Sequence, residues 1–218
     1  MEEHHLETKK TARLFTLGDI EAATEVWIVL HGYAQLASDF IQNFQPLVSS
    51  TTAVIAPEGF HRFYRKGFYG DVVASWMTKE DRLNDIEDYL GFLNTVVDRF
   101  CSERHQLHIL GFSQGVATAC RWVADGRVQP YSLTLWAGSF PRDIDLPGGA
   151  ENIRNTRTFL AYDEADPFRT EESWAKQLDF FKQIGLTPTK YQFSGGHTIP
   201  RDEFTRFVET HINPFLSS

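Results

Sequence analysis

The sequence predicts an α/β protein with a mostly parallel central sheet, helices on both faces and one domain over residues 1–218. Short apolar runs alternate along the chain with longer segments whose apolar residues recur at helical spacing. Such alternation is typical of parallel strands joined by right-handed helical crossovers. A chain of 218 residues suffices for one sizeable core. No insertion long enough for a large cap interrupts the alternation.

The N-terminal part begins with a polar arm and an expected edge strand over residues 12–17. Residues 26–30 are continuously apolar, which is typical of a strand buried on both faces of a parallel sheet. Residues 38–48 place their apolar side chains on one side, so we expect one helix with Ser38 as its N-cap. Residues 53–56 form the next apolar strand.

The middle of the chain carries the longest expected helix, over residues 83–100, where apolar residues follow the helical period. Residues 107–110 are short and mostly apolar, which favours a strand. Residues 116–122 are apolar at helical spacing and contain small side chains that allow close packing.

The C-terminal part continues the pattern with expected strands over residues 131–136, 158–162 and 189–193. The segment 174–184 is an expected helix closed by a glycine, and a last helix is expected over 204–212.

Composition narrows the class of partner. The formal net charge of −8 argues against nucleic acid or an anionic membrane surface as the main partner. Basic and aromatic residues interleave over residues 61–76, a pattern that also occurs in proteins that bind single-stranded nucleic acid. With an acidic total, that segment is better interpreted as a loop packed on the body, or as a lid or wall for an apolar acyl or aryl group.

The two cysteines, Cys101 and Cys120, lie in apparent helices without metal-ligand spacing, so we expect buried free thiols. The polar N-terminus lacks the apolar region of a signal peptide, and no stretch approaches membrane-spanning length. We therefore expect a cytoplasmic protein with no integral membrane segment, no metal and no other cofactor.

The segment Gly-Phe-Ser-Gln-Gly at residues 111–115 lies between an expected strand and an expected helix. It matches the G-x-S-x-G pattern, whose sharp turn exposes a serine at the end of a strand. Small flanking glycines allow the backbone to pass so tightly. The setting predicts that Ser113 is a nucleophile.

A serine hydroxyl is a weak nucleophile and needs a base, which a third group orients. His197 follows the last expected strand in a glycine-rich loop and comes after the serine, whereas His105 and His108 precede it. His211 lies in the terminal helix, where a surface or packing role is more usual. We therefore expect His197 to be the base.

The sequence offers several candidates for the acidic residue that would orient His197. Asp166 stands well into the loop after the strand at 158–162, and is the candidate we favour. Asp163, in the same loop, is its main competitor, or else a turn-forming residue. Asp143 and Asp145 follow the preceding strand.

Negative charge that develops on a carbonyl oxygen needs fixed donors. The amide of Gln114 stands at the start of the helix after the serine, where amides lack intrahelical partners. The amide of Tyr33, in the loop after the strand at 26–30, is the expected second donor of this oxyanion hole. All of these groups follow strands, and ligands of such sheets bind beyond the strands' carboxyl ends.

With these motifs the chain resembles the phospholipase/carboxylesterase branch of the α/β-hydrolases, which includes the acyl-protein thioesterases. The matching segments, in chain order, are Leu-His-Gly-Tyr at 30–33, Ser-Trp at 75–76, Gly-Phe-Ser-Gln-Gly at 111–115, Asp-Pro at 166–167 and Gly-His-Thr-Ile-Pro at 196–200. The resemblance implies an α/β-hydrolase fold, a catalytic triad of Ser113, Asp166 and His197, and an oxyanion hole at Tyr33 and Gln114. The chain departs from the family pattern at 162–165, at Phe168 and Arg169, and at Met77 and Thr78 after Trp76.

These features predict a serine esterase that cleaves small-molecule esters or thioesters through an acyl-enzyme intermediate. Phe68, Tyr69, Trp76 and Phe168 are the expected substrate-binding residues. A hydrolase-fold binding protein with little turnover is the alternative, and a peptidase or acyltransferase would use the same triad. Exposed aromatic residues would also suit the contact of a homodimer.

Overall fold

Seven strands form one sheet in the residues that the computed structural model describes, 1–144 and 148–212. They are β1 (Leu14–Leu17), β2 (Glu25–Leu30), β3 (Thr52–Pro57), β6 (Gln106–Phe112), β7 (Ser132–Trp136), β8 (Arg157–Tyr162) and β9 (Thr189–Gln192). Their order across the sheet is β1-β3-β2-β6-β7-β8-β9. Only β1 at the edge pairs antiparallel, while the other pairs are parallel. The predicted mostly parallel sheet is therefore confirmed.

Most of the helical elements lie between these strands along the chain, and the last two follow β9. They are α1 (Ala37–Phe40), the 3₁₀ helix η1 (Ile41–Leu47), α2 (Arg82–Phe100), α3 (Gln114–Asp125), α4 (Gly148–Arg154), α5 (Glu171–Gln183), α6 (Arg201–Phe207) and the π-helical turn η2 (Val208–Ile212). Among the described residues, no helix combines the length and the apolar character needed to cross a membrane.

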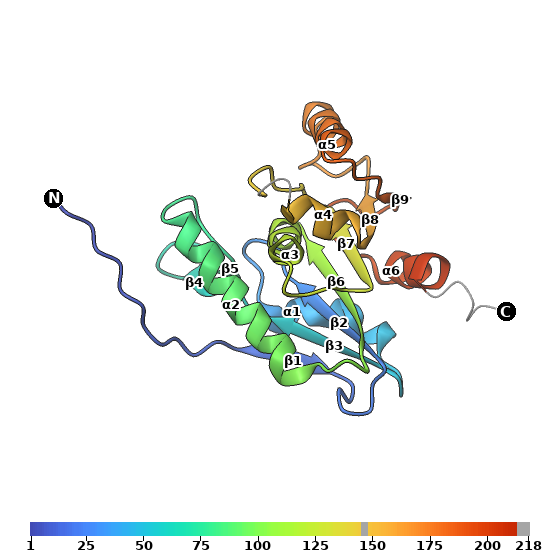
Figure 1. The fold of residues 1–218 in the computed structure, drawn as a ribbon, viewed down its shortest axis with the longest axis horizontal. Helices are drawn as coiled ribbons and strands as arrows, with labels where there is room; N and C mark the ends of the chain where they lie inside the picture. The colour runs from blue at the N-terminus through green and yellow to red at the C-terminus, as the bar shows by residue number, and fades with distance from the viewer. Residues whose placement is uncertain (145–147, 213–218) are drawn as a thin grey trace.

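Side chains of the buried strands alternate between two apolar clusters, one on each face of the sheet. In β2, Val26, Ile28 and Leu30 belong to the cluster that also contains residues of α2, α3, α4 and α5. Trp27 and Val29 belong to the opposite cluster, which contains residues of α1, η1, α6 and η2. Figure 1 shows α2 and α3 along one side of the sheet and α6 on the other. Helices therefore cover both faces, as predicted.

The expected single helix over 38–48 is wrong. Only the four residues of α1 are α-helical, and the chain continues as the 3₁₀ helix η1, which contains Pro46. Proline has no amide hydrogen to donate, so it interrupts regular α-helical bonding there. Ser38 is not the N-cap, a position occupied by Leu36. The carboxylate of Glu58, after β3, instead accepts from the amide of Ala37 at 3.2 Å.

Three elements were not expected from the sequence. Residues 61–76 contain an antiparallel hairpin of β4 (His61–Tyr64) and β5 (Val72–Ser75), and α4 follows β7. The strands of the hairpin have only four residues each, and three of these positions, all in β5, are buried while three others are exposed. Such short, half-exposed segments carry little periodic signal. Cys120 is a buried free thiol as expected, whereas Cys101 is only half-buried.

An aromatic cluster on one face of the sheet is expected to dominate stability. Phe204 of α6 is fully buried, with its ring 5.1 Å from that of Phe44 and 5.6 Å from that of Trp136. Replacing Phe204 with alanine should lower the free energy of unfolding by about 3–5 kcal/mol, because it removes buried surface and leaves a cavity. Phe68→Ala is the matched control, since its side chain is 97% exposed, and should change stability by less than about 0.5 kcal/mol. Urea unfolding measures both, and equal effects would contradict this packing.

Candidate active site

Ser113 occupies a strained turn between β6 and α3. Its φ of 53° and ψ of −114° lie outside the regions that residues other than glycine favour. The turn is possible because α3 begins directly against β2: a Cβ on Gly115 would lie 2.2 Å from the carbonyl oxygen of Leu30. The predicted elbow is thus present, and it projects Ser113 beyond the carboxyl end of β6.

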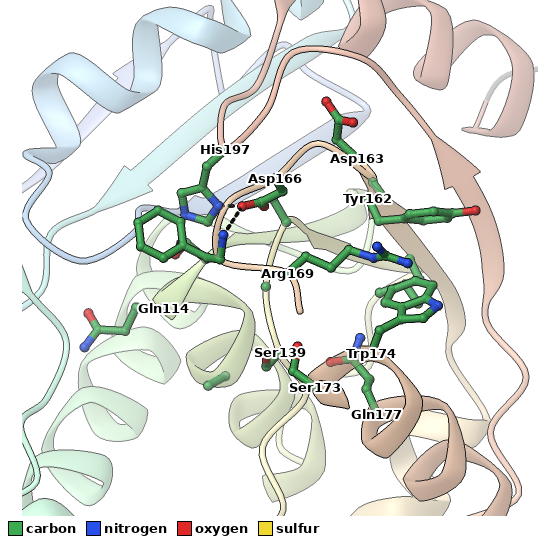
Figure 2. A pocket seen from close by; sticks show the side chains of 17 residues that line it. Gln114, Ser139, Tyr162, Asp163, Asp166, Arg169, Ser173, Trp174, Gln177 and His197 are labelled. Atoms are coloured by element: carbon green, nitrogen blue, oxygen red, sulfur yellow. Dashed lines mark hydrogen bonds and ion pairs between the residues drawn. The ribbon is translucent and has the colours of Figure 1, made fainter. Parts of the chain in front are cut away.

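A chain of hydrogen bonds joins three of the predicted residues. Nε2 of His197 lies 2.9 Å from Oγ of Ser113, and Nδ1 of His197 lies 2.8 Å from Oδ2 of Asp166. A carboxylate accepts only, so Nδ1 carries the hydrogen toward Asp166 and Nε2 accepts from the serine hydroxyl. Figure 2 shows the imidazole and the carboxylate facing each other in the site. The structure therefore brings together Ser113, His197 and Asp166.

Neighbouring groups restrain the imidazole of His197 and the carboxylate of Asp166. The ring of Phe112 lies 5.0 Å from that of His197, and the ring of Phe168 lies 4.6 Å from it in an edge-on arrangement. The second carboxylate oxygen of Asp166 accepts from the amide of Phe168 at 2.8 Å. These contacts restrict rotation of both side chains, which keeps them aligned with Ser113.

Asp163, the main competitor for the acid position, has a different place. Its Oδ2 accepts from the amides of Gly195 and Gly196 at 2.7 and 2.6 Å, and its Oδ1 accepts from the amide of Ala165 at 2.8 Å. The carboxylate thus joins the loop after β8, which carries Asp166, to the loop after β9, which carries His197. Asp163 fixes the relative position of Asp166 and His197 without contacting the imidazole.

The other candidate acids do not enter this hydrogen-bond chain. Asp143 forms ion pairs with Arg82 and Arg121, and Asp145 lies outside the described residues. His108, which precedes the serine, is buried inside β6, where its ring stacks on Trp27 at 4.6 Å. Burial lowers the pKa of His108 to about 3, so this side chain is a neutral core residue.

The loop after β2 lies directly against the elbow. A Cβ on Gly32 would be 3.1 Å from the Cβ of Ser113 and 3.0 Å from the ring of Phe112. The loop that contains Tyr33 therefore lies next to Ser113, and the Tyr33 side chain is exposed. Gln114 is the first residue of α3, where amides have no carbonyl one turn earlier to bind.

His31 and Trp76 hold this loop in place through hydrogen bonds. The Trp76 indole donates to the carbonyl oxygen of His31 at 2.8 Å, and the two rings stack at 5.0 Å. Nε2 of His31 accepts from the amide of Gly59 at 3.0 Å, so Nδ1 carries the hydrogen toward the carbonyl oxygen of Gly32. Burial lowers the pKa of His31 to about 4, so the ring is neutral at pH 7.

The side chain of Gln114 is a structural link that sequence reasoning did not anticipate. Its Oε1 accepts from the amide of Trp76 at 3.1 Å, and its Nε2 donates to the carbonyl oxygen of Met77 at 3.0 Å. Nε2 also donates to Oγ of Ser75 at 3.0 Å. The glutamine thus fastens the segment after β5 to the start of α3. Ser75 and Trp76 belong to one of the segments that carry the family resemblance and Gln114 belongs to another, which was the signal that the sequence offered for this contact.

A cavity of about 320 Å³ adjoins Ser113, between α3, α5 and the loop after β8. Among its walls are Ser113, Gln114, Asp166, Phe168, Arg169 and Trp174. Phe168 is the one expected substrate-binding residue that lines this cavity, and its side chain is 74% exposed. Figure 2 shows His197 and Asp166 at one side of the cavity and Trp174 at the other.

The remaining expected substrate-binding residues do not line this cavity. Trp76 is fully buried, and its indole N–H donates to the carbonyl oxygen of His31. Phe68 and Tyr69 are exposed in the turn of the β4–β5 hairpin. Trp174, Tyr162 and Arg169 contribute to the wall instead. The described residues contain no cluster of three or more His, Cys, Asp or Glu side chains suited to a metal ion.

The profile of one protein family, described as serine hydrolase (FSH1), matches residues 25–207. The chain belongs to this serine hydrolase family. The match covers every strand from β2 to β9 and all three residues of the hydrogen-bond chain. None of the curated protein sequences compared with this serine hydrolase matches it significantly.

Solved structures share the fold of this serine hydrolase at low identity. Acyl-protein thioesterase 2 of Zea mays is 17% identical, with a TM-score of 0.71 over 93% of this chain and 99% of that one. The carboxylesterase of Mesorhizobium loti is 17% identical, with a TM-score of 0.70 over 93% of this chain and 94% of that one. A phospholipase/carboxylesterase of Dyadobacter fermentans is 18% identical, with a TM-score of 0.65 over 95% and 99% of the two chains. The α/β-hydrolase fold predicted from the sequence is confirmed.

The link made by Asp163 predicts a pH-dependent contribution to stability. Hydrogen bonds from the amides of Ala165, Gly196 and Gly195 lower the pKa of this carboxyl below its usual value. The contribution of ionised Asp163 to the free energy of unfolding is therefore full above the unfolded-state pKa of about 4. It is lost as pH falls through the lower folded-state pKa. Asp163→Asn should lower the free energy of unfolding by about 1.5–3 kcal/mol at pH 7.

Urea unfolding at a series of pH values measures this difference between wild type and Asp163→Asn. The difference should be constant above about pH 5 and shrink below about pH 4. Glu164→Gln is the control, since the Glu164 side chain is exposed. A difference that does not change with pH would show that folding does not lower the pKa of Asp163, which would contradict this role.

Proposed function

We propose that this serine hydrolase cleaves carboxylic esters or thioesters through an acyl-enzyme intermediate on Ser113. The observation that carries the proposal is the continuous hydrogen-bond chain from Ser113 Oγ through the His197 ring to Asp166. Such a chain activates a hydroxyl that is otherwise a weak nucleophile. The family and the esterase and thioesterase names of the structural neighbours support the ester or thioester class.

In the first half of the reaction, Oγ of Ser113 attacks the carbonyl carbon while Nε2 of His197 takes the hydroxyl proton. The carboxylate of Asp166 holds the imidazole in the required tautomer and stabilises the imidazolium that forms. The C–O or C–S bond to the leaving group then breaks, and His197 gives its proton to the leaving oxygen or sulfur. The acyl group remains on Ser113.

In the second half, water replaces the alcohol or thiol. His197 takes a proton from the water, whose oxygen attacks the acyl carbon, and returns the proton to Oγ of Ser113. Each tetrahedral intermediate carries a negative oxygen. The amides of Tyr33 and Gln114 would donate to that oxygen, since Gly32 and Gln114 both adjoin Ser113.

Replacing the nucleophile tests the proposal most simply. Ser113→Ala should abolish labelling by a fluorophosphonate probe and hydrolysis of a p-nitrophenyl ester. Asp166→Asn should lower kcat by up to about 10⁴-fold, because the imidazole loses its orienting charge. Asp163→Asn is the matched control for the acid, and should lose far less activity at a temperature where it is folded. Labelling of Ser113→Ala at the wild-type rate would contradict the assignment.

The position of the loop after β2 gives a test of the oxyanion hole. Gly32→Ala places a methyl group against Ser113 and Phe112, which should displace the amide of Tyr33. We expect kcat to fall by about 10²-fold, with a smaller change in KM, since the lost contact stabilises mainly the transition state. Tyr33→Ala keeps the amide and is the control. An equal fall in kcat in the two variants would show that turnover depends on the Tyr33 side chain and would contradict the role of its amide.

A further inference from the structure

Arg169 occupies an unusual position in the wall of the active-site cavity. Its guanidinium carbon lies 4.4 Å from the centre of the Trp174 ring and 5.5 Å from that of Tyr162. Arg169, Trp174 and Tyr162 all line the cavity that contains Ser113 and His197. Figure 2 shows the arginine side chain between Asp166 and these two aromatic side chains. Two aromatic rings therefore hold the cation beside the proposed nucleophile.

The guanidinium has no acidic partner in the part of the chain that the structure describes. None of the ion pairs there includes Arg169, and its buried Nε has no hydrogen-bond partner. The two carboxylates that line the cavity already have donors. Asp166 accepts from His197 and Phe168, and Asp163 accepts from three backbone amides.

The buried Nε has almost no accessible surface, so the donors that a bound anion can reach are the terminal nitrogens of the guanidinium, which form no hydrogen bond within the described residues. Stacking on aromatic rings covers the faces of the guanidinium and leaves its edges to donate. A planar carboxylate accepts two parallel N–H bonds from such an edge. Lys190, whose ammonium lies 5.9 Å from the Trp174 ring, adds a second positive charge at that ring.

We propose that Arg169 selects esters or thioesters that carry a free carboxylate, which it binds in the cavity beside Ser113. The proposal rests on the esterase function proposed above and deepens it by naming the charge of the substrate. The carboxylate accepts from the Arg169 edge while the ester carbonyl lies at Ser113. The residue acts in substrate selection and takes no part in proton transfer.

Matched pairs of substrates measure this selection. Monophenyl adipate is compared with phenyl hexanoate, which has a methyl group in place of the acyl-side carboxylate, and 4-acetoxybenzoate is compared with phenyl acetate, which lacks the carboxylate on the leaving group. Release of phenol, or of 4-hydroxybenzoate from 4-acetoxybenzoate, gives kcat/KM after correction for uncatalysed hydrolysis. Wild type should prefer the charged member of at least one pair by about tenfold or more, the value of a charge-assisted hydrogen bond. No preference in either pair would overturn the proposal.

Arg169→Gln should remove that preference, measured as the ratio of kcat/KM values within a pair. Arg127→Gln is the matched control, because the exposed Arg127 is ion-paired with Asp125 outside the cavity. A purely structural role of Arg169 beneath Trp174 would lower both rates equally and leave the ratio unchanged, which would contradict the proposal. Failure of the proposed esterase function would look different: neither member of a pair would be hydrolysed in a Ser113-dependent manner.

Inhibition of the wild-type enzyme provides a test that needs no variant. Free adipate should inhibit hydrolysis of phenyl acetate competitively and at least about tenfold more strongly than adipamide, its neutral analogue of the same length. Inorganic phosphate tests the other class of anion that accepts two hydrogen bonds from a guanidinium edge. Stronger inhibition by phosphate than by adipate, or equal inhibition by adipate and adipamide, would overturn the assignment of a carboxylate.

Discussion

The whole site depends on the strained turn at Ser113. A backbone with φ of 53° and ψ of −114° costs free energy that the surrounding packing must offset. That packing comes from α3, whose first turn lies so close to β2 that Gly115 has no space for a Cβ. Burial of α3 against the sheet thus holds the serine beyond the end of β6, where the loops after β2, β8 and β9 converge.

Two side-chain links hold these loops in place around the turn. Asp163 joins the loop after β8 to the loop after β9 through backbone amides, so Asp166 and His197 keep one relative position. The Gln114 side chain joins the elbow to the segment after β5, and the Trp76 indole of that segment donates to the carbonyl oxygen of His31 in the loop after β2. Neither link contacts a reacting atom in the proposed mechanism, yet both determine where the reacting atoms lie.

The sequence predicted the parts of the molecule that have strong local patterns. The continuous apolar run at 26–30 and the long amphipathic segment at 83–100 correspond to β2 and α2 within one residue at each end. Ser113, His197 and Asp166 were predictable because the order and loop positions of such residues follow from the topology. The helix expected at 38–48 failed, since a periodic apolar pattern does not distinguish α-helix from the 3₁₀ geometry that Pro46 favours there.

Residues whose roles depend on distant contacts were harder to predict. Trp76 was expected to touch substrate, but its indole is committed to a backbone carbonyl in the core. Arg169 had no motif to mark it. Its position follows from its contact with the ring of Trp174, which belongs to α5, after the loop that carries Asp166. Such contacts arise only when separate loops meet in the folded chain.

In the proposed mechanism, Ser113 becomes acylated during turnover. Mass spectrometry of the enzyme quenched in acid within the first turnovers of p-nitrophenyl acetate tests it directly, followed by peptide mapping of the modified residue. We predict an added acetyl group on the peptide that contains Ser113, formed and lost at rates that match turnover. Turnover without any acetylated enzyme, or an acetyl group on a different residue that forms and decays at the turnover rate, would contradict the account.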